Sequence, residues 1–311
     1  MASQTPAVTV RHPMMGDVRR VLDLMDRVEI AEYGETDSDL VELTHDWEQI
    51  DLGRDAWLVF DGNDTLVGYA AVLPHGEGLR YDFFADPEWP EASLGRALLA
   101  QCEARGAAIA AQQERPLDVT VYVAAVNERD RHIVETADFQ LVRFHYQMRK
   151  KLAGALEEPV WPAGVTVRTA VAGEDDRAIH RLIVTTFSWP DREPVSFEEW
   201  QEMMMRSDIF NPELWFLAVA GEKIIGTCLG YSYPEEGWVR QLAVDVKWQR
   251  RGVGAVLLRH SFKVFKELGH ETVGLGVRAE NETAVRFYER VGMYRARQYD
   301  EYRKVVGGGE K

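Results

Sequence analysis

The sequence predicts an α/β protein of two tandem domains, each built on a central mixed sheet (an α+β arrangement) flanked by helices. Two observations carry this prediction. Segments with strand and helix periodicity alternate along the chain, and the second half repeats landmarks of the first half at a nearly constant spacing. The chain of 311 residues is also long enough for two domains that each bury a core.

The internal repeat connects four landmarks of the first half to matching positions 154 to 159 residues later. The pairs are 8–11 with 165–168, Trp57 with Trp215, Asp86 with Asp245, and Asn127 with Asn281. A drifting but nearly constant offset through matching elements indicates duplication, and each copy is long enough to be a whole domain.

The first copy reads as strand, helix, helix, three strands, helix, strand, helix, strand. Residues 8–11 form the first strand, and apolar residues at helical spacing from Val18 to Val28 predict a helix with Asp17 as a suitable N-cap. The other predicted helices are 40–50, 94–113 and 129–136, and the other strands are 57–60, 66–72, 81–85, 117–124 and 141–148.

The second copy begins at residue 165, so we place the first domain at 1–150, a linker at 151–164 and the second domain at 165–306. The linker contains prolines and glycines and has no clear periodicity. Residues before Thr5 and the glycine-rich tail 307–311 are expected to be flexible.

The strongest chemical signal follows the predicted strand Leu242-Ala243-Val244, where Gln249-Arg250-Arg251-Gly252-Val253-Gly254 leads into an amphipathic helix. Such a turn exposes backbone N–H groups at a helix N-terminus, where the helix dipole favours an anion. The two glycines let a phosphate approach the backbone, and the flanking residues 249–251 add donors and positive charge. The pattern therefore predicts a phosphate or pyrophosphate site, and the alternative is a helix cap with solvated arginines.

Two common phosphate motifs are absent from the sequence. There is no GxxxxGK[ST] and no GxGxxG, which excludes a P-loop and the dinucleotide fingerprint. The loop instead resembles the acyl-CoA loop Q/R-x-x-G-x-G/A of the GNAT superfamily of acyltransferases, with Ala255 following it. A second segment, from Asn281 through Ala284, Phe287 and Tyr288 to Gly292-Met293, resembles the family signature N-x-x-A-x-x-F/L-Y-x-x-x-G-F/M.

The order of elements in each copy also fits a GNAT domain, and the layout of the whole chain is similar to tandem GNAT N-acetyltransferases of the actinobacterial mycothiol synthase-like group. The resemblance implies roles for the residues that match. The backbone of Leu242, Ala243 and Val244 would bind the pantetheine arm and face the thioester, while Asn281, Ala284 and Phe287 would also lie at the cofactor. The alternative interpretation of the strand is core packing, and the two are compatible.

Tyr288 takes the position at which the family places the acid that protonates the leaving thiolate. A phenol suits this task because its unperturbed pKa, roughly 10, lies above that of a thiol. The general base is open, since Trp238, Arg240 and Gln241 are poor bases. Glu235 and Glu236 precede them and would reach an amine through water, although a solvated turn is the preferred interpretation.

The first copy departs from the motifs of the second. Pro90 stands at the position of Gln249 and lacks an N–H, Glu91 opposes a phosphate, and Val134 replaces the tyrosine. We therefore expect residues 1–150 to be a degenerate GNAT-like domain that supports the structure or closes one wall of the acceptor cleft. The remaining Leu94-Gly95-Arg96 leaves weak cofactor binding open.

Composition excludes several classes of function. A net charge of −15 argues against nucleic-acid binding, and no run of eighteen apolar residues predicts a membrane span. Cys102 and Cys228 form neither a disulfide framework nor a metal-binding spacing, so we expect buried thiols and no metal. The N-terminus has no signal-peptide pattern, which favours a cytoplasmic location.

We therefore expect an N-acyltransferase that moves an acetyl group from acetyl-CoA to a primary amine of a small molecule by direct attack, with the chemistry in the C-terminal domain and the protein a monomer or homodimer. Residues 187–205, rich in aromatic residues and methionine, would line the acceptor site or pack in the core. The resemblance offers an amine-bearing sugar conjugate as one acceptor. The alternatives are a non-catalytic acyl-CoA-binding or sensing protein and an acyltransferase with another acyl donor.

Overall fold

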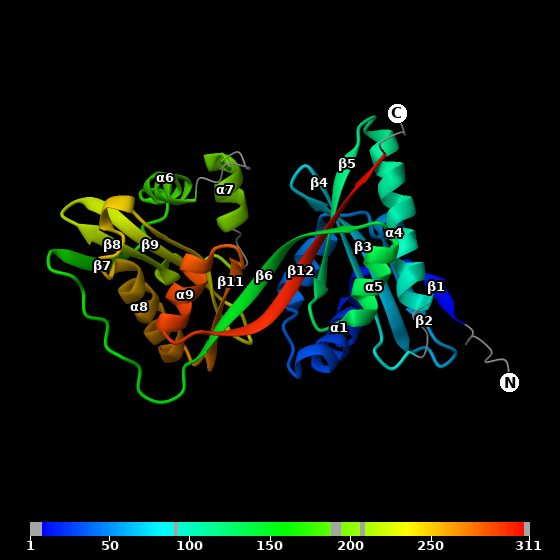
Figure 1. Ribbon diagram of the computed structural model, residues 1–311, viewed down its shortest axis with the longest axis horizontal. Helices are drawn as coiled ribbons and strands as arrows, with labels where there is room; N and C mark the ends of the chain where they lie inside the picture. The colour runs from blue at the N-terminus through cyan, green and yellow to red at the C-terminus, as the bar shows by residue number, and fades with distance from the viewer. Residues whose placement is uncertain (1–7, 90–92, 188–193, 206–208, 308–311) are drawn as a thin grey trace. The chain divides into compact units, whose positions relative to one another are not determined.

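The computed structural model describes residues 8–89, 93–187, 194–205 and 209–307 (Figure 1). The predictions made for the residues before Thr5, for Pro90 and Glu91, and for most of the tail lie outside these residues. The chain divides into two compact units. Unit 1 contains residues 1–145 and 297–311, and unit 2 contains residues 146–296.

Unit 1 is a mixed sheet with helices on both faces, as the sequence predicts. Its helices are α1 (Val18–Tyr33), α2 (Leu40–Glu48), α3 (Leu52–Asp55), α4 (Ser93–Gln112) and α5 (Glu128–Thr136), with a 3-10 turn, η1 (Met15–Asp17), before α1. Its strands are β1 (Thr9–Arg11), β2 (Ala56–Phe60), β3 (Leu66–His75), β4 (Gly78–Ala85), β5 (Leu117–Ala124) and most of β12 (Tyr294–Val306). They lie in the order β1-β2-β3-β4-β5-β12, with β4 and β5 parallel.

Unit 2 repeats this arrangement. Its helices are α6 (Asp176–Thr186), α7 (Phe197–Met204), α8 (Val253–Glu267) and α9 (Glu282–Arg290), with 3-10 turns η2 (Pro212–Leu214) and η3 (Val246–Trp248). Its strands are β7 (Val165–Thr169), β8 (Trp215–Ala220), β9 (Lys223–Ser232), β10 (Gly237–Val244), β11 (Thr272–Arg278) and the second half of β6 (Gln140–Lys151). They lie in the order β7-β8-β9-β10-β11-β6, with β10 and β11 parallel.

In each unit, the last strand of the sheet comes from the other copy of the repeat. The pattern makes β6 the last strand of the first copy and β12 the last strand of the second. In unit 1, however, residues 299–306 of β12 pair antiparallel with β5, whereas residues 146–151 of β6 belong to unit 2. The predicted boundary at 151–164 therefore differs from the division into compact units.

The segment predicted as a linker is packed against unit 2. The N–H of Leu152 donates to Glu271 O at 2.8 Å, and Trp161 makes an edge-on ring contact with His260 of α8. Lys263 Nζ lies 2.9 Å from a carboxylate oxygen of Glu158. These contacts hold residues 152–164 along α8, although they form neither helix nor strand.

The duplication extends to individual side chains. Arg11 at the end of β1 pairs with Asp17 before α1 at 2.6 Å, and Arg168 in β7 pairs with Asp175 before α6 at 2.6 Å. Asp17 holds the predicted N-cap position of α1 but makes no side-chain cap bond. Its carboxylate instead accepts from Arg11 and from the N–H of Met14. The same ion pair thus fixes the first strand to the first helix in both units.

The helices of unit 2 cover opposite faces of its sheet (Figure 1). On one face α6 and α7 pack through residues such as Ile179 and Trp200. On the other face lie α8 and α9, and apolar residues predicted for α8 are buried there: Val253, Leu257, Phe262 and Phe265. Val256 is also buried. The sheet therefore separates two layers of helices.

The packing of α8 requires a glycine in β10. A Cβ built on Gly237 would lie 2.5 Å from two ring atoms of the fully buried Phe265. We expect Gly237→Ala to destabilise the protein by about 1–3 kcal/mol, because an overpacked core must move its side chains. Denaturant unfolding measures this change. Gly62→Ala is the control, since nothing lies within 4 Å of its added Cβ, and an equal loss in both variants would contradict the argument.

Candidate functional site

The predicted phosphate loop lies between the end of β10 and the start of α8. Gly252 is the N-cap of α8 with φ of 86°, and Arg250 has φ of 59°, so the chain passes twice through the left-handed region. The N–H of Val256 donates to Gly252 O at 3.0 Å. The N–H groups of residues 253–255 precede this bond in the first helical turn, and they form a group of donors suited to an anion.

The side chains of the loop divide into two kinds. Arg250 and Arg251 are exposed, and the guanidinium of Arg251 lies over the ring of Trp248 at 5.2 Å from its centroid. Gln249 donates its side-chain N–H to Val244 O at 3.1 Å, so this donor is engaged within the loop. The arginines therefore supply positive charge, while Gln249 ties the loop to the end of β10.

Asp245 fixes the junction between β10 and this loop. Its N–H donates to Ile225 O at 2.9 Å, and its carboxylate accepts from the N–H of Lys247 at 2.9 Å and from Lys223 Nζ at 2.5 Å. The hydrogen bond from Lys223 is the largest cause that lowers the pKa of Asp245 below its usual range. In the sequence Asp245 is only a repeat landmark, and no local pattern indicates Lys223, which lies 22 positions earlier.

Three predicted parts of the site meet at Gly254. A Cβ built on Gly254 would lie 3.5 Å from Phe287 Cζ and 3.5 Å from Val244 Cγ2. Strand β10, the loop and the second motif on α9 therefore converge at one point. The two distances are ordinary van der Waals contacts, so packing does not require glycine here. Close approach of a ligand to the backbone is the remaining physical reason for it.

Strand β10 separates from β11 after two residues. The recorded pairs are Gly237 with Val273 and Trp238 with Gly274, and within these fully described strands none follows. On its other side β10 stays paired with β9 as far as Val244, with a bulge between Val239 and Gln241. We call the opening between β10 and β11 beyond Trp238 the slot.

The slot places backbone groups where the sequence predicts the pantetheine arm. Leu242, Ala243 and Val244 belong to the part of β10 that borders the slot with one edge and pairs with β9 along the other edge. Alternate N–H and C=O groups of β10 point toward the slot and not toward β9. Leu242 and Val244 pack toward α8, and Ala243 is buried on the α6 face. An extended chain with amide groups can therefore pair with β10 as an added strand does.

Tyr288 approaches this strand from the α9 side. Its ring lies 5.3 Å from that of Phe287, and both pack against the core around α8. Burial first, and the thiol of Cys228 second, raise the pKa of Tyr288 above its usual value of 10. Cys228 pairs with Leu242 across β9 and β10, and Tyr288, Cys228 and Leu242 belong to the same core on the α8 face of the sheet.

The second motif forms the start of α9, and Asn281 is the N-cap of this helix. Asn281 Oδ1 accepts from the N–H of Ala284 at 3.1 Å. Asn127 caps α5 in unit 1 in the same way, accepting from the N–H of Asp130 at 2.9 Å. The repeat landmark at these two positions is therefore a helix cap that directs the helix after β5 or β11.

The carboxylate of Glu236 is not in the solvated turn that the sequence favours. It is buried and accepts from Arg149 Nε and Nη2, each at 3.0 Å. Arg149 lies on β6, 87 residues earlier, so no local pattern indicates this ion pair. The prediction of a solvated turn is wrong for Glu236, and the charge of its carboxylate is already paired.

The predicted acceptor segment places two of its described residues, Trp200 and Met204, in the core. Trp200 is buried against Trp215 and donates its indole N–H to Gln241 Oε1 at 3.2 Å. Met204 is also buried, and its backbone oxygen accepts from the hydroxyl of Tyr231 at 2.9 Å. Residues 188–193 of the segment lie outside the described chain. Trp200 and Met204 thus hold α7 against the sheet.

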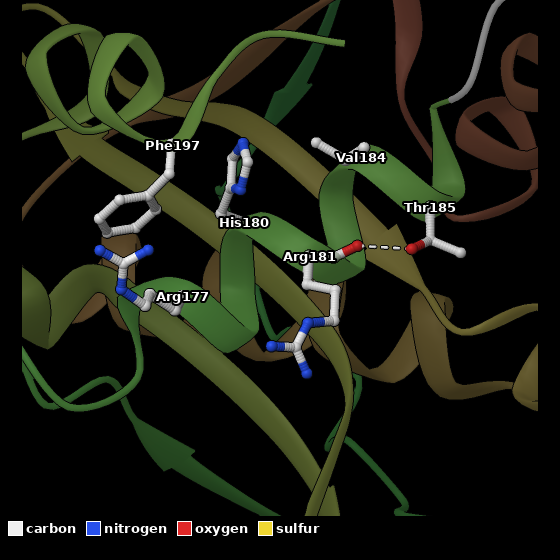
Figure 2. A pocket seen from close by; sticks show the side chains of 6 residues that line it. All are labelled: Arg177, His180, Arg181, Val184, Thr185 and Phe197. Atoms are coloured by element: carbon white, nitrogen blue, oxygen red, sulfur yellow. Dashed lines mark hydrogen bonds between the residues drawn. The ribbon is translucent and has the colours of Figure 1, made fainter.

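A hollow of about 260 Å³ lies beside α6 and the start of α7 (Figure 2). The guanidinium of Arg177 lies 4.2 Å from the ring centroid of Phe197, and a ring nitrogen of His180 lies 2.9 Å from Val195 O. These lining residues project from the side of α6 opposite the buried Ile179 and Leu182. The hollow is therefore separate from the slot. Its lining residues are Arg177, His180, Arg181, Val184, Thr185 and Phe197.

In unit 1, side chains occupy the corresponding positions. A Cβ built on Gly95, the counterpart of Gly254, would lie 2.7 Å from Ile133 Cδ1 and 3.7 Å from Asp130 Oδ1. Asp130 is 7% exposed and stands where unit 2 has alanine. Glu32 of α1 accepts from Asn127 Nδ2 at 2.6 Å. The carboxyl group of Asp130 therefore lies near the start of α4, where it disfavours an anionic ligand.

Glu32 makes the stability of unit 1 depend on pH. Burial raises the pKa of Glu32 from 4.5 to about 7. Because the folded pKa is raised, its contribution is full below pH 4.5 and is lost as pH rises through about 7. We expect the wild type to lose on the order of 2 kcal/mol of stability between pH 5 and pH 8 relative to Glu32→Gln. Denaturant unfolding at both pH values measures this, and equal losses would contradict it.

The fold and the loop together define the class, an acyltransferase of two similar domains with its motifs in the second. A family model described as "Acetyltransferase (GNAT) family" matches residues 177–293. The chain is 31% identical over 247 residues to a mycothiol acetyltransferase of Rhodococcus erythropolis, which covers 75% of the chain and 79% of that protein. It is 30% identical to that of Streptomyces avermitilis over 76% of the chain and 75% of the relative.

Solved structures agree with this assignment. A GCN5-related N-acetyltransferase from Sphaerobacter thermophilus has a TM-score of 0.84 and 31% identity, with 98% of this chain and 97% of that chain covered. A tandem GNAT protein from the clavulanic acid biosynthesis pathway has a TM-score of 0.73 at 15% identity, which supports the fold alone. The chain belongs to the acetyltransferase (GNAT) family. It has two GNAT-like domains and is an acyl-CoA N-acyltransferase.

None of the described helices is both long and apolar enough to cross a bilayer. No group of three or more His, Cys, Asp or Glu side chains in the described ranges is placed to hold a metal ion.

Proposed function

We propose that this protein transfers an acetyl group from acetyl-CoA to a primary amine of a small molecule, in its second domain and by direct attack of the amine on the thioester. The observation that carries the proposal is the convergence of Val244, Gly254 and Phe287 beside the open edge of β10. At this point the N–H donors at the start of α8, which suit an anion, adjoin the slot beside β10, which suits an extended chain with amide groups.

The cofactor would lie along β10 with its pyrophosphate at α8. The N–H groups of residues 252–255 and the charges of Arg250 and Arg251 would hold the phosphates. The pantetheine arm would then run back along Val244, Ala243 and Leu242 and pair with their backbone groups. Asn281, Ala284 and Phe287 would border the arm from α9. A slot that preorganises the donor in this way supplies proximity before any bond is broken.

Tyr288 would act as the acid of the reaction. The amine nitrogen forms a bond to the thioester carbon, and the carbon–sulfur bond then breaks to release the CoA thiolate. Tyr288 Oη would give this thiolate its proton. The nitrogen of the new amide would release one proton to water, and Tyr288 would regain a proton from water. A phenol is protonated at neutral pH even at its unperturbed pKa of roughly 10, and burial raises the pKa of Tyr288 further, so the proton is present when the thiolate leaves. A backbone N–H of β10 directed into the slot would stabilise the carbonyl oxygen as charge develops.

The amine would arrive neutral or lose its proton to water. Among the described carboxylates near the start of β10, Glu236 is engaged with Arg149, which leaves it poorly placed as a base. Relatives at about 30% identity bear the name mycothiol acetyltransferase, so the acceptor of that reaction belongs in any panel of amines. Longer acyl-CoA donors remain the alternative to acetyl-CoA.

The first domain would not bind the cofactor. Asp130 places a carboxyl group near the start of α4, the helix that corresponds to α8, and Ile133 fills the space at Gly95. Its role would be to support the fold or to close one wall of the acceptor cleft.

Calorimetric titration with acetyl-CoA tests both parts of this proposal. We expect one binding site per chain. Two sites would show that the first domain has been wrongly dismissed, and no binding would remove the basis for the donor assignment. Release of free CoA thiol in the presence of a panel of primary amines then separates an enzyme from a protein that only binds acyl-CoA.

A further inference from the structure

The slot closes at Trp238. Residues 239–244 of β10 line it over about 17 Å, at 3.3–3.4 Å per residue. Its far end adjoins the loop at Gly252 and the start of α8, where the anion-binding donors lie. A ligand with phosphates at that end and an extended arm along β10 has its other end at the last paired residue, Trp238.

The indole of Trp238 lies over two glycines of β11. A Cβ built on Gly274 would lie 2.6 Å from Trp238 Cζ3, and one on Gly276 would lie 4.0 Å from Cζ2. Gly274 is the last residue of β11 paired with β10. The indole thus extends along β11 from the last pair toward the opened part, on the face opposite Val273 and Leu275, which pack around α8. It covers the closed end of the slot on the α6 face.

The ion pair between Arg149 and Glu236 supports this indole. Glu236 Oε2 lies 3.1 Å from the same Cβ position on Gly274, so the carboxylate and the indole flank one glycine. Glu236 and Trp238 are two residues apart in sequence and point to the same face. Arg149 holds the carboxylate through two hydrogen bonds of 3.0 Å. A buried bidentate pair of this kind fixes its neighbours in one arrangement.

We propose that Trp238 is the end wall of the slot and limits the acyl group to a short chain. This inference rests on the proposed function, because it needs the acyl-CoA to lie along β10. A half-buried aromatic ring over two glycines leaves little space beyond the thioester for further methylene groups. Trp238 is therefore a specificity-determining residue for the donor, and the ion pair positions it.

Replacing the indole by a methyl group tests the wall. We expect wild-type protein to bind acetyl-CoA more tightly than hexanoyl-CoA in calorimetric titrations. Trp238→Ala should shift the ratio of the two dissociation constants toward hexanoyl-CoA by at least tenfold. Each buried methylene contributes about 0.8 kcal/mol, or roughly fourfold in affinity, so partial burial of the four additional methylenes is sufficient. Trp238→Leu should give a smaller shift in the same ratio, and it replaces the alanine variant in the test if that variant does not fold.

Trp161→Ala is the matched control, because Trp161 contacts His260 of α8, whose ring packs on Phe216 of β8, two strands away from β10. We expect it to leave the ratio unchanged. The inference fails if Trp238 variants bind acetyl-CoA and keep the wild-type ratio, if they lose both donors equally, or if wild-type protein already binds both donors equally well. Absence of binding by wild-type protein to either donor would instead overturn the proposed function, and the wall with it.

Discussion

Tyr288→Phe is expected to lower kcat by 10²- to 10⁴-fold and to leave the affinity for acetyl-CoA within about twofold. The substitution removes one hydroxyl and keeps the ring that packs with Phe287. Loss of the acid would leave the thiolate without a positioned proton at the moment of carbon–sulfur cleavage. Thiol release with the best amine of a panel measures kcat, and calorimetry measures cofactor affinity.

The exposed Tyr294 provides the matched control for this substitution. Tyr294→Phe makes the same chemical change four residues after α9 ends, and we expect wild-type turnover from it. A Tyr288→Phe variant with unchanged kcat would disprove the acid role. A variant that loses cofactor affinity instead would make Tyr288 a binding residue.

Gly254→Glu is expected to weaken acetyl-CoA binding by at least 100-fold without unfolding the protein. An added Cβ meets Phe287 and Val244 only at ordinary contact distances of 3.5 Å, so the backbone has room for a side chain. The new carboxylate, however, would lie in the first turn of α8. It would accept hydrogen bonds from the N–H groups that would otherwise bind phosphate. It would also repel the pyrophosphate. Calorimetry measures the affinity, and thermal unfolding checks the fold.

Two variants separate charge from volume in this prediction. Gly254→Ala adds the Cβ alone and should cost less than tenfold in affinity. Arg96→Glu adds negative charge to an exposed position near the start of α4 in unit 1, and should leave affinity and stoichiometry unchanged. A large effect of Arg96→Glu would contradict the assignment of cofactor binding to the second domain.

Sequence patterns predicted the parts of the fold that repeat. The matching positions near residues 9 and 166 reflect the Arg11–Asp17 and Arg168–Asp175 pairs, and Asn127 and Asn281 are caps in both copies. These features are local, so periodicity and spacing report them. Strand partners are not local. The pattern identifies β6 and β12 as strands but does not determine which sheet each one completes.

The same distinction applies to the candidate site. The loop around Gly252 and the cap at Asn281 depend on neighbours within a few residues, and sequence could predict them. The ion pair of Glu236 depends on Arg149, 87 residues away. The glycines at 274 and 276 make room for the indole of Trp238, and this contact is visible only in the folded structure. Long-range contacts thus account for what sequence analysis missed.

The exchange of the last strands sets the order in which the protein is completed during translation. β5 ends at Ala124, but its partner β12 ends at Val306. At about 5–20 residues per second, the ribosome needs roughly 10 to 35 s to make the intervening chain. During that time β5 presents an open edge of the kind that recruits strands from other chains. The two halves look separable in sequence, but the sheet of unit 1 is completed only after residues 299–306 have been made.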